Sequence, residues 1–94
     1  MNLISKIKNL IKNKQVVYSS EMCSDCQKAE SFFEKYDIDV EIKRIEDPEN
    51  RQELKNKYGK VLVPTIILGN NKFIGFENNQ NEIKNKLGLE NKKI

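Results

Sequence analysis

The 94-residue sequence contains no histidine and no tryptophan, and it has only two cysteines and two prolines. Without histidine, an imidazole can act neither as a general base nor as a metal ligand. No apolar run approaches the roughly 18 residues that a membrane-spanning helix needs. A chain of this length is expected to fold as a single domain over residues 1–94, built around one hydrophobic core.

Neither sign of charge dominates, because 17 basic side chains and 14 acidic ones leave a net charge of +3. The lysines are scattered along the chain, which is typical of a solvated surface rather than of a nucleic-acid-binding one. Residues 1–14 have no continuous apolar segment and no small-residue cleavage site, so we expect no secretory signal. Two cysteines without such a signal suit a reducing compartment, and we predict a cytoplasmic protein.

Both cysteines lie where a predicted strand passes into a predicted helix. Residues 16–18 are apolar, residues 19–22 form a mostly polar turn, and Cys23 and Cys26 stand at the start of the helix. Unpaired N–H groups and the helix dipole stabilise a thiolate there, and the thiolate is the reactive form of cysteine. The second thiol can attack a mixed disulfide formed by the first. A structural disulfide in so short a loop would stabilise little, so the pattern predicts dithiol–disulfide chemistry.

The periodicity of the apolar residues predicts an α/β domain. The expected elements are an amphipathic helix within 1–14, a strand over 15–19, a helix over 24–36, a charged strand over 38–43, a helix over 48–58, strands over 65–68 and 72–76, and a short helix that ends at Gly88. Two strand–helix units imply that the first two strands are parallel, and Gly-Asn-Asn at 69–71 predicts an antiparallel hairpin. We therefore expect a four-stranded mixed sheet with flanking helices, and its charged second strand suits an edge.

The helix that follows the cysteines has one apolar face. Cys26, Ala29, Phe33 and Tyr36 share this face, and we expect it to cover the sheet while Cys23 stays accessible. The helix within 1–14 could lie on a membrane surface, but so small a domain needs its apolar face for the core. We expect it to pack on a redox core formed by residues 15–88.

Three short motifs, in this order, resemble the glutaredoxin branch of the thioredoxin fold. They are the Cys-x-x-Cys after the first strand, Val63-Pro64-Thr65 at the third strand, and Gly75-Phe76-Glu77-Asn78 after the fourth. The resemblance covers about residues 15–88, and an additional N-terminal helix is found in many members. It implies a thiol–disulfide oxidoreductase that contributes to electron transport and cell redox homeostasis, without a bound cofactor. It also implies a monomer that acts on a disulfide-containing protein or a glutathione mixed disulfide, with glutathione or thioredoxin reductase as electron donor and neither nucleic acid nor membrane as a partner.

The resemblance gives the two thiols and the proline specific roles. It implies that Cys23 is the nucleophile and Cys26 the resolving thiol. It makes Pro64 a cis-proline beside them, so that the backbone N–H and C=O of Val63 can pair with an extended substrate. On the residues alone, Pro64 could also be an ordinary proline at a strand entry.

The motif after the fourth strand would complete the substrate groove. The resemblance implies that Gly75 lets a substrate backbone approach closely, although a simple bulge would also explain a glycine there. Phe76 replaces a glycine common in the family and is expected to narrow the groove. Glu77 or Asn78 would meet a substrate amine or amide.

Charged residues around Cys23 depart from the family pattern. Ser24 stands where many relatives have proline, and the anions Asp25 and Glu21 flank Cys23, so we predict a higher Cys23 pKa than in relatives with basic flanks. Lys28 is a candidate cation for the carboxylates of glutathione. These departures favour, as an alternative, a thioredoxin-reductase-linked electron donor to ribonucleotide reductase.

An alternative of another class is an iron–sulfur or metal-binding carrier dimer. Some glutaredoxins bridge a cluster between two subunits with one cysteine from each. A single Cys-x-x-Cys cannot complete a tetrahedral zinc site without a second chain. Two thiols with an acid between them make this alternative weaker than dithiol chemistry, and we predict no resident metal.

Overall fold

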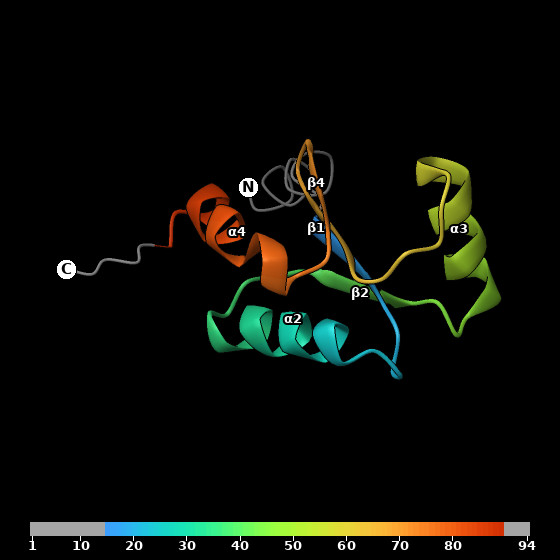
Figure 1. Ribbon diagram of the computed structural model, residues 1–94, viewed down its shortest axis with the longest axis horizontal. Helices are drawn as coiled ribbons and strands as arrows, with labels where there is room; N and C mark the ends of the chain where they lie inside the picture. Colours follow the sequence, from blue (N-terminus) through green and yellow to red (C-terminus); the bar gives the residue numbers. More distant parts are fainter. Residues whose placement is uncertain (1–14, 90–94) are drawn as a thin grey trace, which may run out of the picture.

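The computed structural model describes residues 15–89 (Figure 1). Their elements are β1 (Gln15–Ser19), α2 (Ser24–Lys35), β2 (Glu41–Arg44), α3 (Pro48–Tyr58), β3 (Thr65–Leu68), β4 (Asn71–Ile74), the 3-10 helix η1 (Glu77–Asn79) and α4 (Gln80–Leu87). The helix expected within residues 1–14 lies outside the described residues, so its packing stays a prediction. Among the helices of residues 15–89, none is long and apolar enough to cross a membrane.

The strands form one mixed sheet in the order β2-β1-β3-β4. Strand β1 pairs in parallel with β2 and antiparallel with β3, and β3 pairs antiparallel with β4. The predicted four-stranded mixed sheet, its parallel first pair and the hairpin are therefore confirmed. The charged strand β2 lies at an edge, also as predicted, and the apolar β1 is central.

Side chains of β1 alternate between the two faces of the sheet, and each face has its own core. Val17 points to the face covered by α2 and α4, where the core includes Phe33 and Ile83. Val16 and Tyr18 point to the opposite face, which Leu54 of α3 covers. The helix that begins with the cysteine pair is thus anchored on one face of the strand that leads into it.

The chain after α2 differs from its prediction. Asp37 adopts a left-handed conformation with φ +57°, and the Ile38 N–H donates to the Phe33 carbonyl at 2.8 Å. These contacts close the helix end and postpone the strand to Glu41, so the expected start at residue 38 was wrong. Tyr36 is the C-terminal cap and is 36% exposed. Phe32, which was not expected on the buried face, is only 6% exposed. The buried face of α2 is therefore turned slightly from the predicted one.

The chain after β4 also differs. The strand ends at Ile74 rather than at residue 76, because Gly75 has a φ of +94° that takes it out of the ladder. The short helix η1 follows, and the apolar pattern did not predict it. This bend brings the residues after β4 back over the start of α2.

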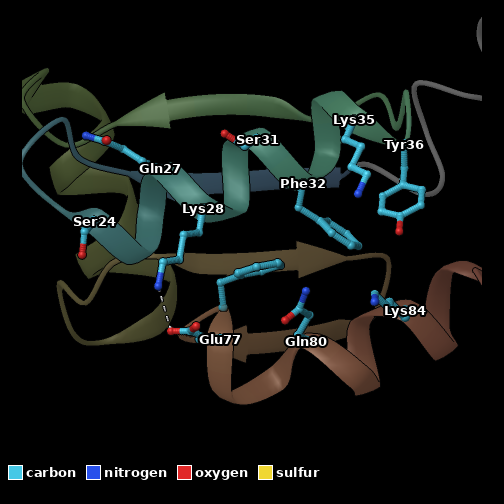
Figure 2. A pocket seen from close by; sticks show the side chains of 11 residues that line it. Ser24, Gln27, Lys28, Ser31, Phe32, Lys35, Tyr36, Glu77, Gln80 and Lys84 are labelled. Atoms are coloured by element: carbon cyan, nitrogen blue, oxygen red, sulfur yellow. Dashed lines mark hydrogen bonds and ion pairs between the residues drawn. The ribbon is translucent and has the colours of Figure 1, made fainter. Parts of the chain in front are cut away.

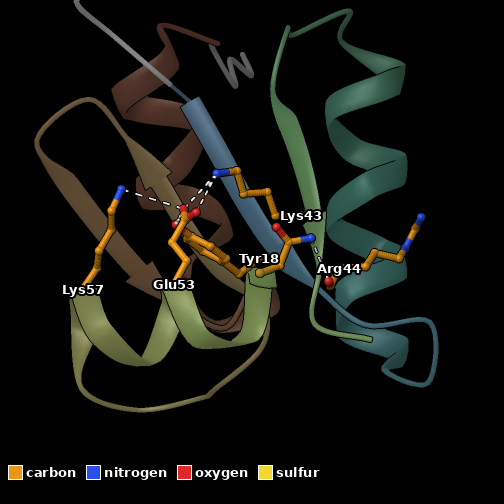
Figure 3. A network of polar contacts seen from close by, with 6 residues as sticks. Tyr18, Lys43, Arg44, Glu53 and Lys57 are labelled. Atoms are coloured by element: carbon orange, nitrogen blue, oxygen red, sulfur yellow. Dashed lines mark hydrogen bonds and ion pairs between the residues drawn. The ribbon is translucent and has the colours of Figure 1, made fainter. Parts of the chain in front are cut away.

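The end of β1 that leads to the cysteines is held from one face by Glu53 of α3 (Figure 3). The Tyr18 hydroxyl donates to the Glu53 carboxylate, and Lys43 of β2 forms an ion pair with the same carboxylate at 2.8 Å. Burial and, to a smaller extent, the Glu53 carboxylate raise the pKa of the Tyr18 hydroxyl. Three elements on the α3 side of the sheet are joined at this carboxylate.

The other face holds the next residue of β1 in a matching way. The Ser19 hydroxyl donates to the Glu30 carboxylate of α2 at 2.6 Å, and Arg44 pairs with the other Glu30 oxygen at 2.7 Å. Ser19 is fully buried. Two successive residues of β1, facing opposite ways, therefore fix the strand just before the loop that carries Cys23.

We expect Glu53→Gln to lower the free energy of unfolding by about 1–2 kcal/mol at neutral pH. The hydrogen bonds from Lys43 and then from Tyr18 lower the pKa of the Glu53 carboxyl. Its stabilising contribution is therefore complete above the unfolded pKa of about 4.3 and is lost as the pH falls through the lowered folded value. Urea unfolding of both proteins at neutral and acidic pH should show a deficit that shrinks below about pH 4.

Glu34→Gln provides the matched control, because Glu34 lies on the exposed face of α2 and has no ion pair within residues 15–89. Its effect is expected to stay within about 0.5 kcal/mol at either pH. A Glu53→Gln deficit that did not change with pH would contradict the ionic explanation.

Candidate redox site

Cys23 is the N-cap of α2, in an extended conformation with φ −111° and ψ +115°. Its sulfur accepts the backbone N–H of Cys26 at 3.1 Å and lies 3.9 Å from the carbonyl oxygen of Val63. Its side chain is partly exposed, as predicted. A thiolate formed here would be stabilised by an N–H donor of the first helical turn, which is the geometry that the sequence predicted.

A network of short contacts holds the loop before Cys23. The Cys23 N–H donates to the Ser20 carbonyl at 3.3 Å, and the Ser20 hydroxyl accepts the Met22 N–H at 3.1 Å. The Glu46 carboxylate accepts from the Ser20 hydroxyl at 2.7 Å and from the Glu21 N–H at 3.2 Å. The loop is thus fastened at its base, while Met22 at its tip is 89% exposed.

Cys26 differs from Cys23 in its environment. It is fully buried, and both cysteines are free thiols. Burial, and then the hydrogen bond with Cys23, raise the pKa of the Cys26 thiol to about 12. Cys26 therefore stays protonated at neutral pH while Cys23 is the thiol that a substrate can reach.

The Val63–Pro64 peptide bond is cis, as the resemblance implied. It places the Val63 carbonyl beside the Cys23 sulfur, and the Pro64 carbonyl accepts the Gly75 N–H at 2.8 Å. The thiol pair, the proline and Gly75 therefore lie together, although they are far apart in sequence. The substrate-pairing role of Val63 stays a prediction.

Asp25 connects the cysteine motif to the chain after β4. One of its carboxylate oxygens accepts the Phe76 N–H at 2.7 Å, and the other accepts the Glu77 N–H at 3.1 Å. The sequence analysis considered only the charge of Asp25, since nothing in the sequence signals a partner some 50 residues away. Its expected effect on the Cys23 pKa stays a prediction, which a titration of Cys23 in an Asp25→Asn variant would test.

The remaining predicted site residues are only partly brought together. Lys28 and Glu77 form an ion pair at 3.1 Å (Figure 2), so each now satisfies the other's charge rather than standing ready for a substrate. Both side chains are more than half exposed, and such a pair is weak enough to open. Asn78 and Glu21 are exposed at the surface. Within residues 15–89, Glu21 forms hydrogen bonds through its backbone and not through its carboxylate.

Phe76 was expected to line and narrow the substrate groove. Its side chain is only 3% exposed, and its effect on a substrate stays a prediction. Its ring packs against Phe32 of α2 with a centroid distance of 5.1 Å. Phe76 is therefore mainly a core residue that fixes the loop after β4. Among residues 15–89 no group of three or more His, Cys, Asp or Glu side chains is placed to hold a metal ion.

Comparisons with known proteins agree with this geometry. The glutaredoxin family model matches residues 15–74, and no curated protein sequence matches the chain significantly. The crystal structure of a glutaredoxin from Archaeoglobus fulgidus is 17% identical, with a TM-score of 0.66 over 86% of this chain and 92% of that one. The solution structure of a dithiolic glutaredoxin from Trypanosoma brucei brucei is 27% identical, with a TM-score of 0.58 over 88% of this chain and 89% of that one.

Proposed function

This chain belongs to the glutaredoxin family of thiol–disulfide oxidoreductases, and we propose that it reduces disulfides with Cys23 as nucleophile and Cys26 as resolving thiol. The observation that carries the proposal is the pairing of an accessible sulfur at the N-cap of α2 with a buried thiol one helical turn behind it. The 27% identity to a dithiolic glutaredoxin supports the same assignment.

In the proposed cycle, the Cys23 thiolate attacks one sulfur of the substrate disulfide. A bond forms between Cys23 and that sulfur, the substrate disulfide breaks, and the first substrate thiolate leaves and takes a proton from water. Cys26 then loses its proton to water and attacks the Cys23 sulfur, which breaks the mixed disulfide and releases the second substrate thiolate; this thiolate in turn takes a proton from water. The protein dithiol has supplied two electrons and is left as a Cys23–Cys26 disulfide, which an external thiol reductant restores.

The burial of Cys26 separates the two steps. In the reduced protein, the hydrogen bond and the charge of Cys23 both add to the burial that raises the Cys26 pKa. Once the Cys23 sulfur is bound in a mixed disulfide, these two contributions are lost and the Cys26 thiol ionises more readily. The resolving thiol is thus activated by completion of the first step.

We further propose thioredoxin reductase as the electron donor, in preference to glutathione. Glutathione carries two carboxylates and would need free donors near Cys23. The N–H groups of Phe76 and Glu77 already bind the Asp25 carboxylate. These contacts support a donor that does not depend on carboxylate recognition beside the thiol pair.

The test is disulfide reduction in two coupled assays with NADPH, one with thioredoxin reductase and one with glutathione and glutathione reductase. We expect turnover with thioredoxin reductase and at most weak turnover with glutathione. In Asp25→Ala, which frees two N–H donors, the glutathione-linked rate should rise by about threefold to tenfold, the equivalent of one net hydrogen bond. Glu34→Gln, which removes a carboxylate of α2 that has no ion pair within residues 15–89, should leave both rates within twofold.

Turnover of the wild-type protein with glutathione alone would overturn the donor assignment and leave the dithiol mechanism intact. No turnover in either assay, with both thiols titratable, would overturn the mechanism itself. In that case, iron and acid-labile sulfide measured in the purified protein would favour the alternative of an iron–sulfur carrier dimer.

A further inference from the structure

A groove of about 620 Å³ runs along α2, on the side that faces η1 and α4 (Figure 2). Its floor is aromatic, because Phe32 lies between Phe76 and Tyr36, with ring centroids 5.1 Å and 4.9 Å apart respectively. Phe32 and Phe76 are nearly buried, whereas Tyr36 is 36% exposed. The accessible part of this floor is therefore mainly the Tyr36 ring, which a side chain from another molecule can cover.

Lysines dominate the charge of the groove. Lys28, Lys35 and Lys84 line it together with a single acid, Glu77, which is paired with Lys28 at 3.1 Å. The Lys35 ammonium lies 5.4 Å from the centre of the Tyr36 ring. Neither Lys35 nor Lys84 has an ion pair among residues 15–89. The end of the groove beyond Lys28 is therefore positive and has no internal counter-ion in the described part of the chain.

Lys35 and Lys84 come from different elements and converge on the same space. Figure 2 shows Lys35 of α2 and Lys84 of α4 on opposite sides of the groove, with the Tyr36 ring beside them. An anionic group placed between them would gain attraction from both. An aromatic or aliphatic neighbour of that group would meet the Tyr36 and Phe32 rings.

The other end of the groove adjoins the redox site. Ser24, which follows Cys23 directly, lines this end, and Lys35 is the last residue of α2. The helix between them rises about 1.5 Å per residue, which amounts to about 17 Å. An extended chain covers about 3.3 Å per residue, so about five residues would reach from one end to the other.

Building on the proposed disulfide reduction, we propose that this groove binds an acidic segment of the protein whose disulfide is reduced. The segment would place a carboxylate between Lys35 and Lys84, and an apolar side chain on Phe32 and Tyr36. It would lie about four to six residues from the cysteine that Cys23 attacks, by the helix and strand dimensions given above. A second copy of this chain fits less well, because its own groove would bring a like charge.

The test uses two symmetrical peptide disulfides and the pre-reduced protein, without a reductase. Each peptide has a single cysteine, with the same three-residue segment four to six residues away on both sides of it. This segment is Phe-Glu-Glu in the acidic peptide and Phe-Gln-Gln in the neutral one. Each turnover oxidises the protein dithiol and releases two peptide thiols, which are measured. We expect the acidic peptide to react about tenfold faster at low salt, and added salt to reduce this preference.

Protein variants locate the preference. In the Lys35→Gln/Lys84→Gln double variant, the ratio between the two peptides should fall to within about twofold. Lys86→Gln serves as the matched control, because Lys86 is an exposed lysine of α4 that does not line the groove. It should keep the tenfold ratio.

The small neutral disulfide bis(2-hydroxyethyl) disulfide separates this proposal from the function on which it rests. If the reduced wild-type protein fails to reduce it, the proposed dithiol mechanism fails. If it is reduced while both peptides react equally fast, only the groove proposal is overturned. If Lys86→Gln lowered the ratio between the two peptides as much as the double variant does, the proposal would also be overturned, since general surface charge would then explain the preference.

Discussion

Cys23→Ser is expected to abolish disulfide reduction, with a loss of at least about a thousandfold in the rate constant for the first step. A serine hydroxyl does not ionise near neutral pH and cannot form the mixed disulfide. The N-cap itself should survive, because serine is among the preferred N-cap residues and can accept the Cys26 N–H. The loss is therefore expected without loss of the fold, which circular dichroism would confirm.

Cys26→Ser is the matched variant, and its defect should come one step later. Cys23 can still attack, so mass spectrometry should find one substrate half bound per protein, and no turnover of a protein disulfide. A Cys26→Ser protein that accumulated no adduct, or a Cys23→Ser protein that did, would reverse the roles assigned to the two thiols.

Phe33→Ala is expected to lower the free energy of unfolding by about 3–5 kcal/mol. Phe33 is 1% exposed, lies in the core between α2 and the sheet, and meets Phe32 edge-to-face with centroids 5.2 Å apart. Its removal leaves a cavity under the helix that begins at the nucleophile. Since small domains have only about 5–15 kcal/mol in total, the variant should unfold at a much lower urea concentration.

Tyr36→Ala provides the comparison within the same helix. Tyr36 is 36% exposed and contacts the Phe32 ring from outside the core, so its loss should cost at most about 1 kcal/mol. Equal costs for the two variants would contradict the assignment of Phe33, rather than Tyr36, to the buried face.

Local signals in the sequence were sufficient for much of the fold. Asp47 caps α3 by accepting the Glu49 N–H at 3.0 Å, and Gly59 ends the helix with a φ of +84°; aspartate and glycine are residue types that favour these two positions. The charge of β2 predicted its position at the edge of the sheet. Each of these signals lies within a few residues of the feature that it predicts.

The contacts that complete the candidate site are of another kind. Asp25 binds the backbone beyond β4, and Lys28 pairs with Glu77, in both cases about 50 positions along the chain. Nothing in the sequence selects these backbone N–H groups for Asp25, or Glu77 over the other acidic residues for Lys28. Likewise, Phe32 is buried against Phe76, the residue just before η1, and no apolar pattern in the sequence predicted that contact.

The Asp25 contacts also couple the two halves of the site thermodynamically. Asp25 stands between the two cysteines, and its carboxylate holds the backbone of Phe76 and Glu77. A ligand that shifts this backbone must also work against hydrogen bonds anchored beside the thiols. If oxidation of the thiols disturbs Asp25, it will also change the affinity for that ligand. By reciprocity, the ligand changes the equilibrium between dithiol and disulfide by the same factor.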